Sequence, residues 1–186
     1  MKNDILITGT NRGLGLALVK LFLESGNTVY ALYRTMSEDL KQLKNEFQDN
    51  LHLYQVDVTK ENNIQNALSK IKNKTNSIDI LINNAAVHFE NHRPHLEHTD
   101  FEAIVQTFEV NSIAPLKIIK YFIPLVMNSR RKLIVNISSE AGSISFQTWR
   151  ESEYGYCMSK AALNMMSKLL HNCFKKDRVK ILAIHP

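Results

Sequence analysis

Short runs of apolar and β-branched residues alternate, from one end of the chain to the other, with segments whose apolar positions recur every three or four residues. Several of the short runs are almost continuously apolar, as is typical of strands that are covered on both faces of a sheet. They predict six strands, at residues 5–8, 29–33, 51–56, 78–82, 133–137 and 179–183.

The segments between these runs have the spacing of amphipathic helices, with one apolar stripe each. The first three stripes are Leu14, Leu18, Leu21 and Phe22; Leu40, Leu43 and Phe47; and Ile64, Leu68 and Ile71. Further along, Thr99 and Glu102 have the spacing of a capping box, which predicts a helix that runs toward Asn111. A strictly alternating strand–helix order requires a parallel sheet with right-handed crossovers and helices on both faces.

The length and composition fit one folded domain. A chain of 186 residues buries roughly 70% of the surface that it exposes when unfolded, so it needs no disulfide or metal to fold. Apolar residues make up 44% and charged residues 22%, which excludes wholesale disorder. No repeat or low-complexity linker divides the sequence. We therefore predict an α/β fold with a doubly wound parallel sheet, in a single domain over residues 1–186.

Charge and cysteine content narrow the partners and the compartment. Lys and Arg outnumber Asp and Glu by 23 to 18, but the lysines are scattered and no basic cluster interleaves with aromatic residues, so we expect no nucleic-acid partner. The most apolar later stretch, residues 113–127, is interrupted by two lysines and two prolines, so we expect no membrane span. Two cysteines, Cys157 and Cys173, cannot form a disulfide framework, which favours a reducing, cytoplasmic location.

A glycine-rich turn follows the first predicted strand directly and leads into the first helix. It reads Thr8-Gly9-Thr10-Asn11-Arg12-Gly13-Leu14-Gly15. Glycines at such a turn let the backbone approach a pyrophosphate, and the helix N-terminus supplies N–H donors and a favourable dipole. An ordinary tight turn would have the same composition, but the position between a strand and an amphipathic helix favours a dinucleotide site.

This turn has the pattern T-G-x-x-x-G-x-G and resembles that of the short-chain dehydrogenase/reductase family. Four later motifs resemble the same family in the same order. They are Asn83-Asn84-Ala85-Ala86, with Ala86 in place of a final glycine; Asn111 with Pro115; Ser138 to Gly142; and Tyr156 with Lys160. The residues of the glycine turn are most similar to those of the carbonyl-reductase-like, C-factor-like branch of this family. The resemblance implies a Rossmann-like fold and an oxidoreductase that interconverts a carbonyl and an alcohol by hydride transfer.

The end of the second strand indicates which cofactor is bound. An NAD site needs a carboxylate there for the ribose hydroxyls, whereas this chain has Tyr33 and Arg34 and no acid before Glu38. A guanidinium forks onto phosphate oxygens, so Arg34 favours NADP(H), although a solvated arginine would look the same. The resemblance adds an adenine contact at Asp57 and Val58. The full candidate set is Gly9, Asn11, Arg12, Gly13, Leu14, Gly15, Arg34, Asp57, Val58, Asn84, Ala85, Ala86, Tyr156 and Lys160.

Carbonyl reduction also needs an acid and a donor to the substrate oxygen. Lys160 lies one helical turn after Tyr156, where its ammonium can stabilise the tyrosine anion; Tyr154 has no lysine at that spacing. Ser139 rather than its neighbour Ser138 is the candidate donor, because the serine of the family motif precedes the glycine by three positions. The resemblance further implies that Asn111 organises a water in a proton relay from Lys160.

Four histidines, at positions 88, 92, 95 and 98, have a spacing that a metal site could use, but Pro94 interrupts any helix there and no cysteine is near. We expect a solvated loop and no metal. The predicted helix 155–174 is apolar around much of its circumference, so that one face covers the sheet and the other either contacts a second subunit, in a homodimer, or packs within the core.

The resemblance also implies a Pro-Gly turn, a substrate lid and a seventh strand after the sixth. The chain ends at His185-Pro186, so we expect these parts to be missing and turnover to be reduced. The expected substrate is a small carbonyl or alcohol. The alternative function is a non-catalytic NADP(H)-binding regulatory or signalling protein.

Overall fold

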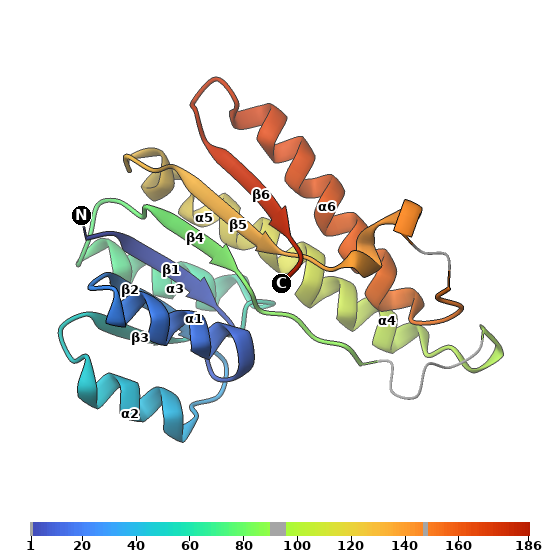
Figure 1. Cartoon of the computed structure of the whole chain (residues 1–186), viewed down its shortest axis with the longest axis horizontal. Helices are drawn as coiled ribbons and strands as arrows, with labels where there is room; N and C mark the ends of the chain where they lie inside the picture. Colours follow the sequence, from blue (N-terminus) through green and yellow to red (C-terminus); the bar gives the residue numbers. More distant parts are fainter. Residues whose placement is uncertain (1, 90–95, 147–148) are drawn as a thin grey trace.

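Six parallel strands form one sheet in the computed structural model, which describes residues 2–89, 96–146 and 149–186 (Figure 1). The strand order is β3-β2-β1-β4-β5-β6. The strands are β1 (Asp4–Thr8), β2 (Thr28–Tyr33), β3 (Leu51–Gln55), β4 (Ile80–Asn83), β5 (Leu133–Ile137) and β6 (Lys180–Ile184). All six agree with the predicted strands to within two residues at each end.

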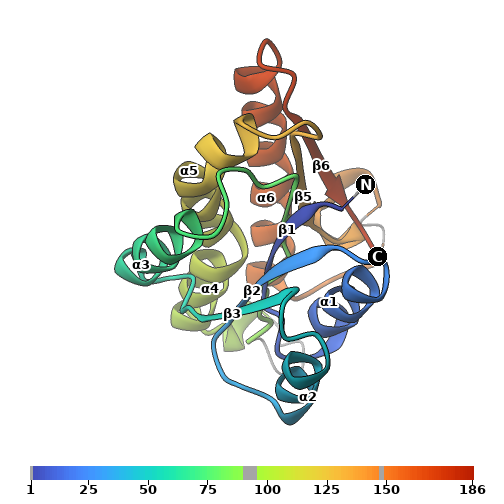
Figure 2. The same ribbon diagram turned by 90° about the vertical axis from the view of Figure 1, so that its left-hand side faces the viewer.

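Helices cover both faces of the sheet, which confirms the doubly wound α/β fold (Figure 2). On one face α1 (Gly13–Glu24) and α2 (Glu38–Glu46) pack against β1, β2 and β3. On the other face lie α3 (Glu61–Lys72), α5 (Ala114–Met127) and α6 (Tyr154–Phe174). The short turns are η1 (Leu96–His98), η2 (Glu109–Ile113), η3 (Glu140–Gly142) and η4 (Ile144–Phe146), and α4 (Phe101–Phe108) precedes η2.

The predicted stripe on α1 is half right: Leu18 and Phe22 pack against the core, whereas the other two members do not. Leu14 and Leu21 are 39% and 55% exposed, and the buried residues are instead Gly15, Val19 and Leu23. The reason is the close approach of the first helical turn to the end of β1: only a glycine fits where Gly15 faces the backbone of the preceding turn. That contact turns the helix, and the residues four and eight positions later then face the sheet. The stripes on α2 and α3 are confirmed.

The cap of α4 is one residue later than the predicted capping box. The side chain of Asp100, not Thr99, accepts hydrogen bonds from the backbone N–H groups of Glu102 and Ala103, at 2.9 and 3.1 Å. An Asp at the N-cap is as good an acceptor as a Thr and adds a charge that the helix dipole favours.

A single helical segment over residues 101–127 joins α4, the π-helical turn η2 and α5. Pro115 lies at the start of α5 and Pro124 lies inside it, yet the helix continues through both. Contrary to expectation, the prolines do not interrupt this stretch. By length and mean hydropathy the segment is apolar enough to span a membrane, but half of its most apolar window is buried within the protein, as in a core helix. The absence of a membrane partner stays a prediction.

The strand order reverses direction between β1 and β4, which are neighbours in the sheet although β2 and β3 separate them in sequence. In open parallel sheets the crevice beyond the carboxyl ends of the strands at such a point is where ligands bind. The glycine turn after β1 and the Asn-Asn-Ala-Ala segment after β4 therefore meet at the same crevice.

Candidate functional site

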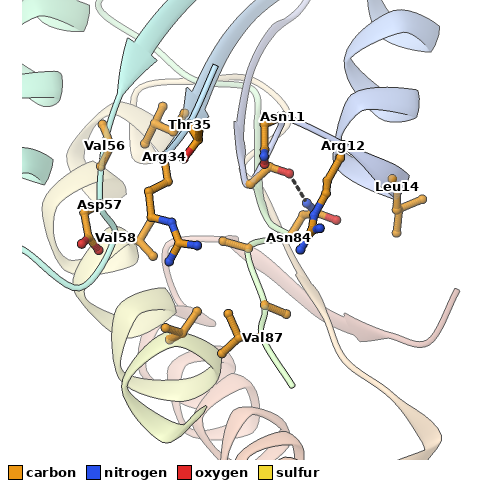
Figure 3. Close-up of a pocket in the computed structure, with 17 residues that line it drawn as sticks. Asn11, Arg12, Leu14, Arg34, Thr35, Val56, Asp57, Val58, Asn84 and Val87 are labelled. Atoms are coloured by element: carbon orange, nitrogen blue, oxygen red, sulfur yellow. Dashed lines mark hydrogen bonds between the residues drawn. The ribbon is translucent and has the colours of Figure 1, made fainter. Parts of the chain in front are cut away.

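A pocket of about 490 Å³ opens at this crevice (Figure 3). It brings together every predicted cofactor residue except Tyr156 and Lys160. Its lining comprises Gly9, Asn11, Arg12, Gly13, Leu14, Gly15, Arg34, Asp57, Val58, Asn84, Ala85 and Ala86, together with Leu32, Thr35, Val56, Val87 and Val110. This second group was not predicted from the sequence, although Thr35 directly follows Arg34 at the end of β2 and could have been found there.

The glycine turn is built so that backbone lies against backbone. Gly9 has a φ of 70°, and a Cβ on Gly15 would come within 2.1 Å of the Gly9 carbonyl oxygen and 2.5 Å of Nδ2 of Asn84. Asn84 locks the turn, because its Nδ2 donates to the carbonyl oxygens of Thr8 and Gly9 at 2.9 and 3.0 Å. The side chain of Arg12, the N-cap of α1, makes no cap hydrogen bond. This cradle and helix N-terminus fit the pyrophosphate of a dinucleotide.

The far rim of the pocket carries Arg34, whose exposed side chain projects beside Asp57 and Val58 in Figure 3. Burial alone would raise the pKa of Asp57, but the hydroxyl and backbone N–H of Thr59 donate to its carboxylate at 2.7 and 3.0 Å and, with the charges of Lys60 and Arg34, hold that pKa below its usual value. Asp57 is therefore an acceptor, and Arg34 with Thr35 supplies donors that fit an anionic group at this rim.

Lys160 occupies a second centre, close to the end of β5. Its residue is only 2% exposed, and its Nζ donates to the carbonyl oxygen of Ile137 at 2.9 Å. Burial lowers the pKa of Lys160 to about 8. The same Nζ lies 5.7 Å from the ring centroid of Tyr156, one helical turn earlier. The hydroxyl of Tyr154 donates instead to the backbone oxygen of Glu151, at 3.1 Å.

Asn111, in the π-helical turn η2, connects the pocket to the helix that carries Lys160. Its side-chain oxygen accepts from the backbone N–H of Val87, at 2.8 Å, and its Nδ2 donates to the Val87 carbonyl, at 2.9 Å, and to the Ser159 hydroxyl, at 3.1 Å. Val87 lines the pocket, and Ser159 precedes Lys160 on α6. The predicted role of Asn111 in a water relay stays a prediction, but the side chain fixes the pocket wall relative to the lysine.

The two adjacent serines after β5 differ in their surroundings, as strand alternation predicts. Ser138 is buried and donates to Oδ1 of Asn164 at 2.6 Å, whereas Ser139 is half-buried and caps η3 through an acceptor bond from the N–H of Ala141. The last position of this motif requires a glycine, because a Cβ on Gly142 would lie 2.7 Å from the carbonyl oxygen of Lys160. The glycine therefore lets the serine turn pack directly on α6 at the lysine. Asn164, one turn after Lys160, was missed.

A second hollow, of about 330 Å³, lies beside Ser139, between η3 and the end of β6. Its other lining residues are Ser138, Glu140, Ser143, Phe146, Asn164, Ala183, Ile184 and His185. Of the four histidines singled out in the sequence, His92 and His95 lie outside the described residues. Within residues 2–89, 96–146 and 149–186, no group of His, Cys, Asp or Glu is arranged to hold a metal ion.

Comparison with known proteins decides the family. The sequence profile of the short chain dehydrogenases matches residues 3–186. The chain belongs to the short-chain dehydrogenase/reductase family. It is 32% identical over 183 residues to an uncharacterized oxidoreductase of Schizosaccharomyces pombe, covering 97% of this chain and 71% of that protein. It is 29% identical over 189 residues to the benzil reductase ((S)-benzoin forming) of Bacillus cereus, covering 98% and 74%.

Solved structures place this short-chain dehydrogenase/reductase among carbonyl-reductase-like members. The carbonyl reductase Sniffer of D. melanogaster matches with a TM-score of 0.92 at 27% identity, covering 100% of this chain and 81% of that one. The NADPH-bound carbonyl reductase from chicken fatty liver matches with a TM-score of 0.89, also at 27% identity, covering 100% and 76%. The fold, the family and oxidoreductase chemistry are thus established for this chain.

Proposed function

We propose that the protein is an NADP(H)-dependent oxidoreductase that interconverts a small carbonyl compound and its alcohol. The observation that carries this proposal is the buried Lys160 one helical turn after Tyr156, with the Ser139 turn packed against the same lysine through Gly142. Among the described residues, the Lys160 ammonium is hydrogen-bonded to a backbone carbonyl and forms no ion pair with a carboxylate. An ammonium buried in this way is costly, and such groups cluster at functional sites.

Each residue then has a distinct chemical task. The bound nicotinamide would supply the hydride, and the protein supplies the proton and the electrostatics. The Tyr156 hydroxyl donates its proton to the developing alkoxide, and the Lys160 ammonium stabilises the phenolate that remains. The Ser139 hydroxyl donates a hydrogen bond to the same substrate oxygen. Asn111 holds the wall between the cofactor pocket and α6.

The choice of NADP(H) over NAD(H) rests on Arg34 and Thr35 at the rim of the pocket. A guanidinium forms a two-pronged, charge-assisted bond with a 2′-phosphate, whereas the ribose hydroxyls of NAD(H) offer no charge to pair with it. The chicken carbonyl reductase, which is similar in structure, was solved with NADPH bound.

Calorimetric titration with NADPH and NADH tests the proposal directly, followed by absorbance assays with NADPH and a panel of aldehydes, quinones and diketones. We expect NADPH to bind more tightly than NADH. We also expect NADPH to be oxidised only when a carbonyl compound is present. Equal affinities would refute the cofactor assignment. Tight NADPH binding without any oxidation would favour the regulatory alternative.

The proposal includes a cytoplasmic homodimer. The exposed apolar residues Met165 and Leu169 on α6 and Phe101 and Val105 on α4 support self-association, because these two helices pack side by side. Cys157 and Cys173 form no disulfide within the described residues, which suits a reducing compartment. Sedimentation velocity at several protein concentrations tests the dimer, and a single monomeric species throughout would reject it.

A further inference from the structure

A charged network that the proposed reaction does not use lies against Tyr156. Its centre is Glu153, which immediately precedes α6 and has a side chain only 8% exposed. Arg150 donates to one carboxylate oxygen of Glu153, and Nε2 of His88 lies 3.6 Å from the other. A buried carboxylate is stable only when it is paired, so the position of Glu153 depends on these partners.

The backbone of Glu153 is also held in an uncommon conformation. Its φ is 65° and its ψ is 39°, in the left-handed region that residues other than glycine avoid. Such strain persists where the surrounding structure over-determines it, and it clusters at functional sites. Here it occurs three residues before Tyr156, at the point where the chain turns into the helix that carries both Tyr156 and Lys160.

His88 connects Glu153 to the tyrosine. Its imidazole packs on the ring of Tyr156 with the ring centroids 4.7 Å apart and the planes tilted by 40°. The backbone just before it is fixed, because both polar backbone atoms of Val87 bond to Asn111. The imidazole therefore approaches the tyrosine from a loop whose start is anchored, and its Nε2 faces the carboxylate of Glu153.

The network also reaches the serine turn. A second guanidinium nitrogen of Arg150 lies 3.2 Å from Oε1 of Glu140, the residue after Ser139. The two ion pairs of Arg150 and the contact between His88 and Glu153 thus join three segments: the turn after β5, the start of α6 and the loop after β4. Each segment carries one of the groups that the proposed reaction needs close to the substrate oxygen or the cofactor.

We propose that Glu153 is a positioning residue, which acts through His88 to fix the ring of Tyr156 and so directs its hydroxyl at the substrate oxygen. This inference rests on the proposed function. Glu153 touches neither substrate nor cofactor in this account. Its effect is geometric, and misplacement of a reacting group by about 1 Å can cost up to two orders of magnitude in rate.

The first experiment follows the Tyr156 ring without any turnover. The chain has six tyrosines, so the ¹⁹F spectrum of protein labelled with 3-fluorotyrosine is simple, and the Y156F spectrum assigns the Tyr156 signal. We expect E153Q and H88A each to shift that signal. The matched control is E61Q, which removes an ion-paired carboxylate from the start of α3 and should leave the signal in place. An unshifted Tyr156 signal in E153Q would overturn the proposal.

The second experiment measures kcat with NADPH and a carbonyl compound that the wild-type protein reduces. We expect E153Q and H88A each to lower kcat about tenfold while the Kd for NADPH changes less than twofold. Because Glu153 acts through His88, the double variant should be no slower than H88A alone. Fully multiplicative losses would show that Glu153 acts independently of His88 and would overturn the proposal. A lower melting temperature with an unchanged kcat would show that the network only stabilises the fold.

Glu153→Gly separates positioning from folding. Glycine adopts the left-handed backbone freely, so this variant relieves the strain while it removes the carboxylate. The proposal predicts a stable protein with the same loss of kcat as E153Q; an unchanged kcat would overturn it. If the wild-type chain reduces no carbonyl at all, the proposed function fails, and the ¹⁹F arm alone then decides whether Glu153 positions Tyr156.

Discussion

The proposed cofactor pocket and the proposed catalytic corner lie at the same edge of one sheet, but they are built in different ways. The pocket is formed by consecutive stretches of chain at strand ends, and its shape depends on backbone packing, as at Gly9 and Gly15. The corner around Tyr156 and Lys160 is assembled from side chains that are far apart in sequence, joined by the amide of Asn111 and by the ion pairs of Glu153.

This difference predicts which substitutions each region tolerates. A backbone cradle fails when a side chain is added to it, whereas a side-chain assembly fails when a single functional group is removed. Variants in the pocket should therefore act on cofactor affinity, and variants in the corner should act on turnover with the affinity kept.

The sharpest contrast comes from Tyr156→Phe. This change removes the proposed acid but keeps the ring, so we expect turnover to fall by about 10²–10⁴-fold while the Kd for NADPH stays within a few-fold. Tyr154→Phe is the matched control, since its hydroxyl bonds to the backbone of Glu151 and not toward the lysine. Steady-state kinetics and calorimetry measure both effects, and equal damage from the two changes would show that the wrong tyrosine was chosen.

In the pocket, Arg34→Asp should reverse the cofactor preference. Loss of a charge-assisted bond of about 1.5–3 kcal/mol weakens NADPH binding by roughly 10–100-fold, and the new carboxylate suits the ribose hydroxyls of NADH. Arg131→Asp makes the same change of net charge at an exposed position before β5 and should alter neither affinity. A lower kcat in R34D at saturating cofactor would contradict the prediction that pocket variants act on cofactor affinity alone.

Gly15→Ala tests the backbone cradle itself. The added Cβ would meet the Gly9 carbonyl oxygen at 2.1 Å, so we expect a loss of about 1–3 kcal/mol in stability and weaker cofactor binding. Gly13→Ala is a useful comparison, because its Cβ meets nothing within 4 Å and only the φ of 55° is unfavourable. Urea unfolding and NADPH titration should show the larger change in G15A; the opposite order would refute the packing argument.

The smallest predicted effect is the pH dependence that Lys160 imposes on folding. Burial lowers the pKa of Lys160 to about 8 from 10.5, so between these values the unfolded chain binds more protons than the native one. Stability lost by burying the ammonium is therefore regained as pH rises, by about 2 kcal/mol between pH 7.5 and 9.5. Lys160→Met should lack this gain in urea unfolding curves. An equal pH response in both proteins would contradict the burial of a charged lysine.

The same contrast explains how much could be predicted from the sequence. The strands and most of the pocket residues were found because both are local: an apolar run, a glycine turn and Arg34 at a strand end. Only half of the α1 stripe was found: Leu18 and Phe22 pack against the core, but the fully buried positions Gly15, Val19 and Leu23 were missed, because the packing of Gly15 against Gly9 sets the rotation of the helix.

The catalytic corner was less accessible to sequence reasoning. Family resemblance indicated Tyr156 and Lys160, but the contacts of Asn111 with Val87 and Ser159 depend on a π-helical turn that no pattern predicted. Glu153 carries no motif, and its role depends on partners that lie 65 positions earlier and three positions earlier, His88 and Arg150. Long-range side-chain assemblies of this kind become visible only in the folded chain.

The most direct test compares the wild-type chain with Y156F in one set of samples, by NADPH titration and by NADPH oxidation with a panel of carbonyl compounds. We predict that both proteins bind NADPH with similar affinity and that only the wild type oxidises it when a carbonyl compound is present. Binding by both without oxidation by either, or oxidation at the same rate by both, would contradict it.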